Sequence, residues 1–223
     1  MSRAVILFTR VPLPGKTKTR LLPRLSPEQC ARLHSAFLRD IAHTCAQLPR
    51  CRLLLCRAPE GDPAVLTQLL PGLPPPLLQQ GETLGARMDH ALRQGLASGP
   101  QSCLLIGADL PEVSIGHLEE AFRLLEDNDA VLGPTDDGGY YLVGVRRPQP
   151  ALFRVSGYGG STVLEQTLSA AASAGLRCAL APPCADVDKP ADLDALARRL
   201  AGRPGQCPHT RRLLAEWGLL KEG

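Results

Sequence analysis

The sequence predicts an α/β protein with one domain, in which a mostly parallel β-sheet carries helices on both faces. Short apolar runs that are typical of buried strands alternate along the chain with segments whose apolar residues recur every three or four positions. Parallel strands joined by helical connections need helices on both faces of the sheet. The length of 223 residues, 44% of them hydrophobic, provides enough apolar surface for one well-packed core.

The first half of the chain begins with a strand and a well-marked helix. Residues 4–8 are an uninterrupted apolar run, which predicts a buried strand. Ser26 as N-cap, Pro27 at the first helical position and Gln29 as the partner of Ser26 in a capping box predict a helix start. Apolar residues at helical spacing extend this helix: Cys30, Leu33, Phe37 and Ile41. The next elements expected are a strand at 52–56, a helix at 63–70, Leu77-Leu78 after a proline-rich turn, and a helix marked by Leu84, Met88, Leu92 and Leu96.

The second half continues the alternation of strands and helices. Strands are expected at residues 102–107, 130–133, 140–145 and 177–181, and helices at 115–125, 162–174 and 191–201. Only a tight turn with two glycines precedes residues 140–145, which favours an antiparallel direction for this strand. A turn at 202–208 sets off a small C-terminal helix. We therefore expect residues 1–201 to form the domain and residues 202–223 to be a helical extension of it.

Charge and composition argue against several classes of protein. The chain has 25 basic and 22 acidic residues, a net charge of +3, which does not suggest binding to nucleic acid or to an anionic membrane. It has no signal-peptide pattern and no apolar run near the ~18 residues of a transmembrane helix, so we expect a cytoplasmic protein without a membrane span. The eight cysteines contain no C-x-x-C pair, and we expect free, buried thiols.

A basic loop, residues 9–21, directly follows the first predicted strand. Its Lys18 and Arg20 can neutralise phosphates, and Gly15 lets the backbone approach a ligand without a Cβ in the way. A solvated basic turn is the alternative for such a run of charges. Open α/β sheets bind ligands outside the carboxyl ends of their strands, so the position of the loop favours a phosphate site.

This loop is not a P-loop, although Gly15-Lys16-Thr17 resembles the end of one. The P-loop pattern requires a glycine where this chain has Arg10. A P-loop also wraps phosphates with successive backbone N–H groups, and Pro12 and Pro14 lack that donor. We therefore expect phosphates to be bound by side chains rather than by a backbone cradle.

Acidic residues at two places indicate a metal site. Asp109 emerges at the end of a buried strand, where a carboxylate can hold a divalent cation that bridges phosphate oxygens. The alternative is that Asp109 only caps the following turn. In the segment 186–193, Asp188 supplies a second ligand, whereas Asp192 is better explained as a first-turn charge that interacts with a helix dipole.

Five motifs occur in an order that resembles a known family, the GT-A-type nucleotide-diphospho-sugar transferases. Each motif is weak alone, but together they cover roughly residues 3 to 200. The motifs are Pro-x-Pro-Gly-x-x-Lys-Thr-Arg-Leu from Pro12, Gln-Gly-x-x-Leu-Gly-x-Arg-Met from Gln80, Ile-Gly-x-Asp-x-Pro from Ile106, Gly-Pro-x-x-Asp-Gly-Gly-Tyr-Tyr-Leu-x-Gly from Gly133, and Asp-x-Asp-x-Pro-x-Asp-Leu from Asp186.

The resemblance implies a GT-A, Rossmann-like sheet that binds a nucleotide, with Asp109 on a divalent metal, Mg²⁺ or Mn²⁺, at the diphosphate. More distantly the chain is similar to the nucleotidyltransferases that activate phospholactate or molybdopterin, which share a basic loop and an acidic ending of this type. The sequence departs from the family at Tyr158-Gly159-Gly160, where the family usually shows Trp followed shortly by Thr. This departure bears on acceptor recognition.

Asp137 is the second predicted catalytic residue, because a carboxylate beside two glycines can orient or deprotonate an acceptor hydroxyl. An ordinary turn is the alternative for Asp-Gly-Gly. The predicted site is, in full, Asp109 and Asp137 as catalytic residues, Arg10, Gly15, Lys18, Arg20 and Arg87 on the nucleotide, Gly138, Gly139, Tyr140 and Tyr158 on the acceptor, and Asp109 and Asp188 on the metal.

These observations favour a metal-dependent glycosyltransferase that uses a nucleotide sugar and a small-molecule acceptor. Breaking the bond of a nucleotide sugar leaves a diphosphate, which needs cations. The first alternative is a nucleotidyltransferase that releases pyrophosphate from an NTP and a phosphorylated acceptor. The second is a catalytically silent nucleotide-binding protein, suggested by the departure at Tyr158. Homo-oligomerisation stays open.

Overall fold

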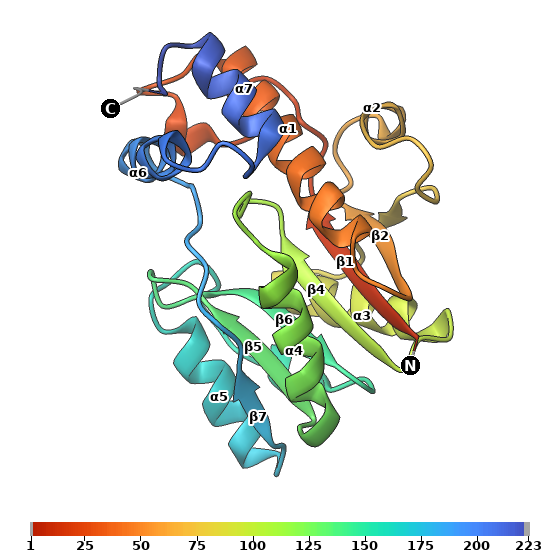
Figure 1. Cartoon of the computed structure of the whole chain (residues 1–223). Helices are drawn as coiled ribbons and strands as arrows, with labels where there is room; N and C mark the ends of the chain where they lie inside the picture. Colours follow the sequence, from red (N-terminus) through yellow and green to blue (C-terminus); the bar gives the residue numbers. More distant parts are fainter. Residues whose placement is uncertain (1, 221–223) are drawn as a thin grey trace.

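The computed structural model describes residues 2–220, in which seven strands form a single sheet with the order β3-β2-β1-β4-β6-β5-β7 (Figure 1). The strands are β1 (Arg3–Thr9), β2 (Cys51–Arg57), β3 (Leu77–Leu78), β4 (Ser102–Gly107), β5 (Ala130–Pro134), β6 (Tyr140–Val145) and β7 (Cys178–Leu180). The helices are α1 (Pro27–Ala46), α2 (Pro63–Leu69), α3 (Leu84–Ala97), α4 (Ile115–Asp127), α5 (Val163–Ser173), α6 (Pro190–Ala201) and α7 (Pro208–Glu216).

The direction of β6 sets it apart from the other strands. It runs antiparallel to both β4 and β5, whereas β1 is parallel to β2 and β4, and β5 is parallel to β7. The hairpin before β6 therefore lies at the same edge of the sheet as the carboxyl ends of the parallel strands. The predicted mostly parallel sheet and its one antiparallel strand are both confirmed.

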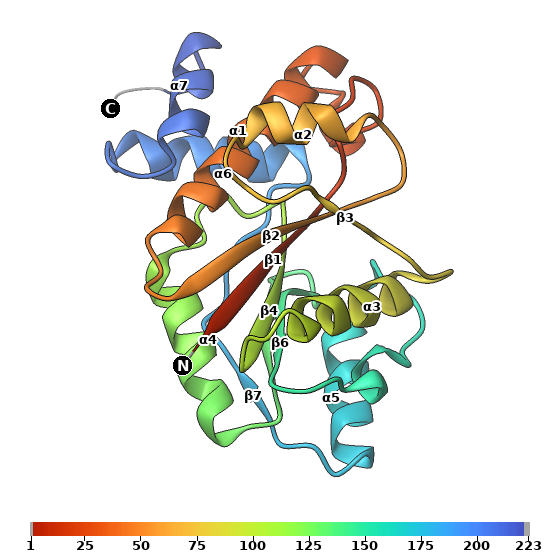
Figure 2. The same ribbon diagram turned by 90° about the vertical axis from the view of Figure 1, so that its right-hand side faces the viewer.

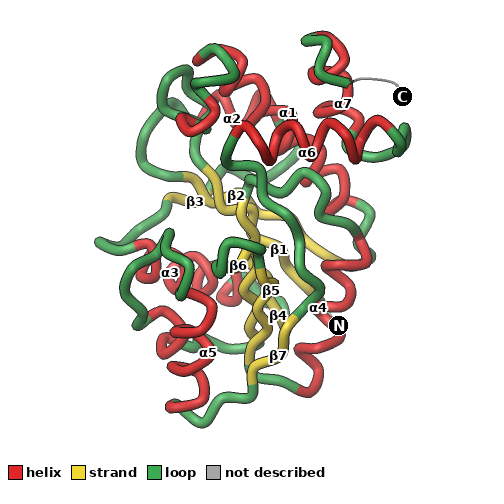
Figure 3. The backbone as a smooth tube through the Cα atoms, turned by 90° about the vertical axis from the view of Figure 1, so that its left-hand side faces the viewer, coloured by secondary structure: helices red, strands yellow, loops and turns green. Residues whose placement is uncertain are grey.

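Helices cover both faces of the sheet, as the sequence predicts. Figure 3 shows α3 and α5 on one side of the strands and α4 on the other. Apolar residues of α1, α2 and α4 pack against one face, and those of α3 and α5 against the opposite face. The strands between these layers are apolar on both faces, and Val5, Ile6 and Leu7 in β1 are fully buried.

A third apolar cluster joins α1, α6 and α7 at one end of the molecule (Figure 2). Leu33 and Phe37 of α1 and Leu214 of α7 are fully buried in it. The Asp40 carboxylate of α1 also accepts hydrogen bonds from the backbone N–H groups of His209 at 2.9 Å and Thr210 at 2.8 Å. Because the first N–H groups of a helix lack internal partners, Asp40 stabilises the start of α7.

Local signals in the sequence place the other elements well. Ser26 and Gln29 form the predicted capping box of α1, with the Gln29 N–H donating to Ser26 Oγ at 3.2 Å. The predicted boundaries of most helices and strands lie within two residues of the observed ones. Two short 3-10 helices, Thr19–Leu21 and Pro150–Phe153, were not expected. No helix within residues 2–220 has the length and apolar character needed to cross a membrane.

Candidate functional site

Two adjoining cavities lie at the edge of the sheet where the parallel strands end and the β5–β6 hairpin turns. The larger has a volume of about 800 Å³ and the smaller about 200 Å³. Asp109, just after β4, and Asp137, in the hairpin, line both of them. The two predicted catalytic carboxylates therefore lie at the junction of the cavities.

Lys18 of the basic loop binds the Asp109 carboxylate directly. Its Nζ lies 2.6 Å from Asp109 Oδ1 and donates a second hydrogen bond, of 3.0 Å, to the carbonyl oxygen of Val187. The ammonium also lies 4.4 Å from the centre of the Phe37 ring, and the side chain is only 2% exposed. Lys18 thus joins the basic loop to the β4 end and to the segment before α6.

The other predicted nucleotide-binding cations line the larger cavity and are more exposed. Arg20 is 64% exposed and lies 3.2 Å from the Asp188 carboxylate. Arg10 donates to the carbonyl of Lys16 and Arg87 to the carbonyl of Gly81, so both guanidinium groups keep unused N–H donors.

Gly15 lines neither cavity. Its φ of +72° lies in the left-handed region that favours glycine, and a Cβ at this position would meet no atom within 4 Å. Gly15 therefore shapes the turn of the basic loop. Its backbone does not line either cavity, where the sequence led us to expect a close approach to a ligand.

The carboxylates around the junction influence one another. Burial raises the pKa of Asp109, but Lys18 and then His34 more than offset this effect, so its pKa lies below the ordinary value. Burial, with the neighbouring Asp109 charge, raises the pKa of Asp188. Burial and the charge of Asp188 raise the pKa of Asp186 to about 6. Mutual repulsion of this kind is relieved when a cation binds among the carboxylates.

The donor chemistry of this group fits a hard divalent cation, because carboxylate oxygens are the ligands that Mg²⁺ and Mn²⁺ prefer. Asp109 and Asp188 line the same cavity, and Lys18 binds both Asp109 and the carbonyl of Val187, the residue before Asp188. Within residues 2–220, no group of three or more His, Cys, Asp or Glu side chains is close enough to form a complete protein ligand set. Water and phosphate oxygens would have to supply the remaining ligands.

Asp137 is held firmly in the hairpin. Its Oδ1 accepts hydrogen bonds from Thr135 Oγ1 at 2.6 Å and from the Gly139 N–H at 3.0 Å. The Thr135 bond is the largest cause that lowers the pKa of Asp137. Gly138 has a φ of +85°, and a Cβ there would clash with the carbonyl oxygen of Ser161. Gly139 lines the smaller cavity, whereas Gly138 lines neither.

Tyr140 and Tyr158 form an aromatic wall of the smaller cavity. The rings line the cavity, whereas both hydroxyl oxygens are buried and not open to it. Burial raises the pKa of both phenols. Gly85, on α3, makes room for this arrangement, since a Cβ there would come within 2.8 Å of the Tyr158 hydroxyl.

Sequence reasoning missed several residues of the larger cavity. His34, on α1, lines this cavity, and its Nε2 lies 3.0 Å from Thr9 Oγ1. A single histidine on a helix gives no signal in the sequence of such a position. Gln79 is 6% exposed and donates from its amide to the carbonyl oxygens of Thr9 and Cys56. Its position after Leu77-Leu78, at the end of a strand, is the signal that could have found it.

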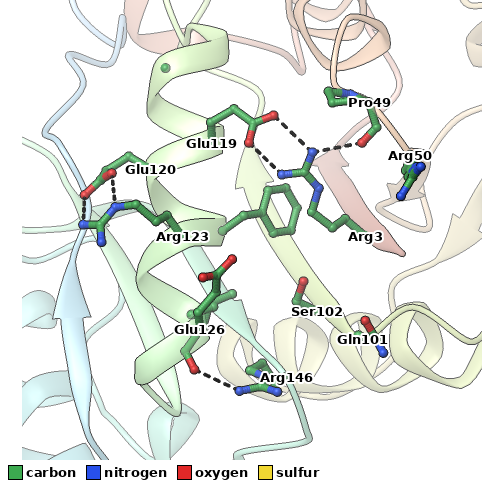
Figure 4. Close-up of a pocket in the computed structure, with 13 residues that line it drawn as sticks. Arg3, Pro49, Arg50, Gln101, Ser102, Glu119, Glu120, Arg123, Glu126 and Arg146 are labelled. Atoms are coloured by element: carbon green, nitrogen blue, oxygen red, sulfur yellow. Dashed lines mark hydrogen bonds and ion pairs between the residues drawn. The ribbon is translucent and has the colours of Figure 1, made fainter. Parts of the chain in front are cut away.

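A cavity of about 930 Å³ lies at the opposite edge of the sheet, where β1 and β4 begin (Figure 4). Two of its arginines form ion pairs with glutamates: Arg3 binds Glu119 at 2.7 Å and Arg123 binds Glu120 at 2.6 Å. Arg146 donates to the carbonyl oxygen of Glu126. None of the predicted site residues lines this cavity.

Comparison with family models gives one match, over residues 41–159, to the family described as "Uncharacterized protein conserved in bacteria (DUF2064)". The chain therefore belongs to the DUF2064 family. A crystal structure of a "putative nucleotide-diphospho-sugar transferase" from Desulfovibrio desulfuricans G20 is 31% identical, with 99% of this chain and 97% of that chain covered and a TM-score of 0.88. The predicted resemblance and GT-A fold class are confirmed.

Two more distant structures share the fold with this DUF2064 member. CMP:2-keto-3-deoxy-manno-octonic acid synthetase, solved with CTP, is 12% identical at a TM-score of 0.57, with 90% of this chain and 99% of that chain covered. The inositol-1-phosphate CTP transferase from T. maritima is 13% identical at 0.55, with 90% and 94% covered. Comparison with functionally curated proteins gives no match. The names of the Desulfovibrio desulfuricans and T. maritima proteins are those of transferases, the class of enzyme that the sequence predicts.

Proposed function

We propose that the protein is a metal-dependent glycosyltransferase that uses a nucleotide-diphospho-sugar donor and a small acceptor. The observation that carries this proposal is the junction of two unlike cavities at Asp109 and Asp137. Cations line the larger cavity, which suits a nucleoside diphosphate, and carboxylates and tyrosines line the smaller, which suits an acceptor with hydroxyl groups. The name of the relative from Desulfovibrio desulfuricans supports the same class of donor.

On the donor side, Arg20, Arg10 and Arg87 are the cations that bind phosphate oxygens through their unused N–H groups. Lys18 is buried against Asp109, so its charge acts on the diphosphate at close range without leaving this ion pair. Gly15 contributes through the turn that carries these side chains.

Asp109 and Asp188 are the residues that would hold the divalent ion, Mg²⁺ or Mn²⁺. Such an ion, when bound, neutralises the charge that develops on the leaving diphosphate. Arg20 lies beside Asp188 and adds positive charge at the same point. The role of Asp109 is therefore to hold the cation beside the diphosphate, and not to act as a nucleophile.

In the reaction, the acceptor hydroxyl attacks the anomeric carbon of the donor sugar, and the bond from this carbon to the diphosphate oxygen breaks. The nucleoside diphosphate leaves with the bonding electrons, and the proton of the acceptor hydroxyl passes to solvent water. Asp137 orients that hydroxyl through Oδ2, because Oδ1 is engaged by Thr135 and Gly139. Its lowered pKa makes Asp137 a hydrogen-bond acceptor rather than a strong base.

The runner-up is nucleotidyl transfer on the same fold. The larger cavity has room and cations for a triphosphate, and two structures of the same fold belong to a CTP-bound synthetase and a CTP transferase. There the phosphate of an acceptor would attack the α-phosphorus of an NTP, and pyrophosphate would leave. A protein that binds nucleotides without turnover is the third possibility.

We further propose that the protein works in the cytoplasm on small molecules and binds no nucleic acid. Residues 1–201 would be the catalytic domain, and residues 202–223 an extension that belongs to it. The contact of Asp40 with the start of α7 supports this arrangement, since it ties the extension to the helix that follows the basic loop.

The test is a thermal-shift screen of UDP-, GDP-, CDP-, ADP- and TDP-sugars and the NTPs, each with and without Mg²⁺ or Mn²⁺. A ligand that binds only the folded state raises the apparent melting temperature. We expect one nucleotide sugar to give a metal-dependent shift that Asp109→Asn abolishes while the variant stays folded. A shift from NTPs alone would favour nucleotidyl transfer, and a metal-independent shift that survives in Asp109→Asn would contradict the metal role of Asp109.

A further inference from the structure

The smaller cavity has a distinctive charge. Three carboxylates line it, from Asp109, Asp137 and Asp186, and none of its lining residues is Lys, Arg or His. Apart from Thr135, the rest of the lining is glycine, apolar or aromatic, and it includes Leu84 and Met88 of α3. Lys18 balances the charge of Asp109, but a ligand beside Asp137 and Asp186 meets negative charge.

The cations of the site line the larger cavity. Lys18 lines the larger cavity, and its ammonium is shared between Asp109 and the carbonyl of Val187. Arg20 also lines the larger cavity and pairs with Asp188. An anionic group in the smaller cavity would lie next to Asp137 and Asp186, which have no ion pair with a Lys or Arg among the described residues.

The polar groups of the smaller cavity are suited to hydroxyl groups of a ligand. The carboxylate oxygens of Asp137 and Asp186 can accept hydrogen bonds from such groups. The rings of Tyr140 and Tyr158 line the cavity, whereas their hydroxyl oxygens are buried and not open to it. The volume of about 200 Å³ is below the roughly 300–1,000 Å³ of pockets for drug-sized ligands, which limits the ligand to a small molecule.

We propose that the acceptor is a small polyhydroxy compound, neutral or cationic, that carries no phosphate or carboxylate group. The inference rests on the proposed function, because it names the substrate class of the acceptor side of that site. It also separates the two enzymatic alternatives, since the acceptor of the nucleotidyltransferase alternative is itself phosphorylated. Asp137 and Asp186 exclude such an acceptor by charge and accept hydrogen bonds from hydroxyl groups.

Matched pairs of compounds test this proposal by binding, without the need for turnover. The full chain is first saturated with the nucleoside diphosphate of the donor that the thermal-shift screen selects, with Mg²⁺, so that the larger cavity is filled. Saturation-transfer NMR then compares glycerol with glycerol 3-phosphate, and glucose and glucosamine with glucose 6-phosphate. We expect the phosphorylated members to bind about tenfold more weakly or worse, because of the added like charge. Equal or tighter binding of the phosphorylated members, or no binding of the others, overturns the proposal.

Variants assign the selectivity to named side chains. Asp186→Asn should reduce the discrimination against the phosphorylated members severalfold. Asp136→Asn, next to Asp137 in the hairpin but outside both cavities, should not change it. Tyr140→Phe and Tyr158→Phe are further controls, because their buried hydroxyl oxygens are not open to the cavity, and they should leave the binding of the neutral members unchanged.

The outcomes also separate this inference from the proposed function. A chain that binds no nucleotide contradicts the proposed function. A chain that binds the nucleotide but treats the paired compounds alike contradicts only the acceptor class.

Discussion

The Lys18 ammonium lies 2.6 Å from the Asp109 carboxylate and is almost fully buried, whereas Arg20, two residues later, is 64% exposed. The sequence presents these two cations as equivalent phosphate ligands. The structure separates them: Lys18 holds three segments together at the centre of the site, and Arg20 reaches into the larger cavity with most of its surface free.

Lys18→Ala and Arg20→Ala should therefore have different effects. Loss of Lys18 leaves Asp109 and the Val187 carbonyl without their partner, and we expect the free energy of unfolding to fall by about 1–3 kcal/mol. Loss of Arg20 breaks an exposed ion pair that contributes little stability, but donor affinity should fall by about 1.5–3 kcal/mol. Urea denaturation and donor titration measure the two quantities. Arg24→Ala is the control, because Arg24 pairs with Asp194 outside both cavities. Equal donor affinity in the Arg20 and Arg24 variants would mean that the loop is only a solvated surface.

Asp137→Asn should lower kcat by about 100-fold or more and leave the donor Kd unchanged. The amide keeps the shape of the side chain but is a poor acceptor for the hydroxyl that must lose its proton. Steady-state kinetics and donor titration separate the two parameters. Asp136→Asn removes the neighbouring charge, which lines neither cavity, and should leave both unchanged. Loss of donor affinity together with kcat would place Asp137 on the nucleotide instead.

The two glycines after Asp137 should respond differently to alanine. Gly138→Ala should destabilise the fold, because φ is +85° and the new methyl group would clash with the Ser161 carbonyl. Gly139 lacks a positive φ, and its methyl group would lie 3.1 Å from both Asp137 Oδ1 and Thr135 Oγ1. We expect Gly139→Ala to lower turnover with a smaller loss of melting temperature. If Gly139→Ala unfolds the protein while Gly138→Ala does not, the geometry of this turn is wrong.

His34 should make the protein sensitive to mild acid. Burial lowers its pKa to about 4, and Nδ1 has no partner among the described residues. The unfolded chain, with a His pKa near ~6.5, binds a proton before the folded one does, so stability falls as the pH drops from about 6.5 towards 4. The loss at the acid end should be on the order of 2–3 kcal/mol. Urea denaturation at several pH values should show a shallower decline for His34→Gln, and an unchanged decline would remove His34 as the cause.

Short-range patterns carried most of the fold prediction. The Ser26 capping box, the apolar run of β1 and the turn before β6 depend on neighbours in sequence, and all three occur as predicted. The sequence could also predict that Asp109 and Asp137 lie close together, because both follow strands that end at the same edge of the sheet.

Other features depend on contacts between distant segments. The burial of Lys18 requires Phe37 of α1 and the Val187 carbonyl, neither of which the basic loop itself can indicate. Side chains two residues apart lie on the same side of a regular extended segment. In this segment, however, Asp186 lines the smaller cavity and Asp188 the larger. The path of this segment is fixed by Asp192, which accepts hydrogen bonds from the backbone N–H groups of Asp188 and Lys189.

Helix α1 concentrates three of these contacts at residues three positions apart. His34 lines the larger cavity behind Thr9, Phe37 lies under the Lys18 ammonium, and Asp40 holds the start of α7. A saturation-mutagenesis map of activity would therefore show a stripe of intolerant positions along a helix that carries none of the predicted site residues. Such a stripe would be mistaken for packing alone, although Phe37 contacts the Lys18 side chain of the basic loop and His34 lines the larger cavity.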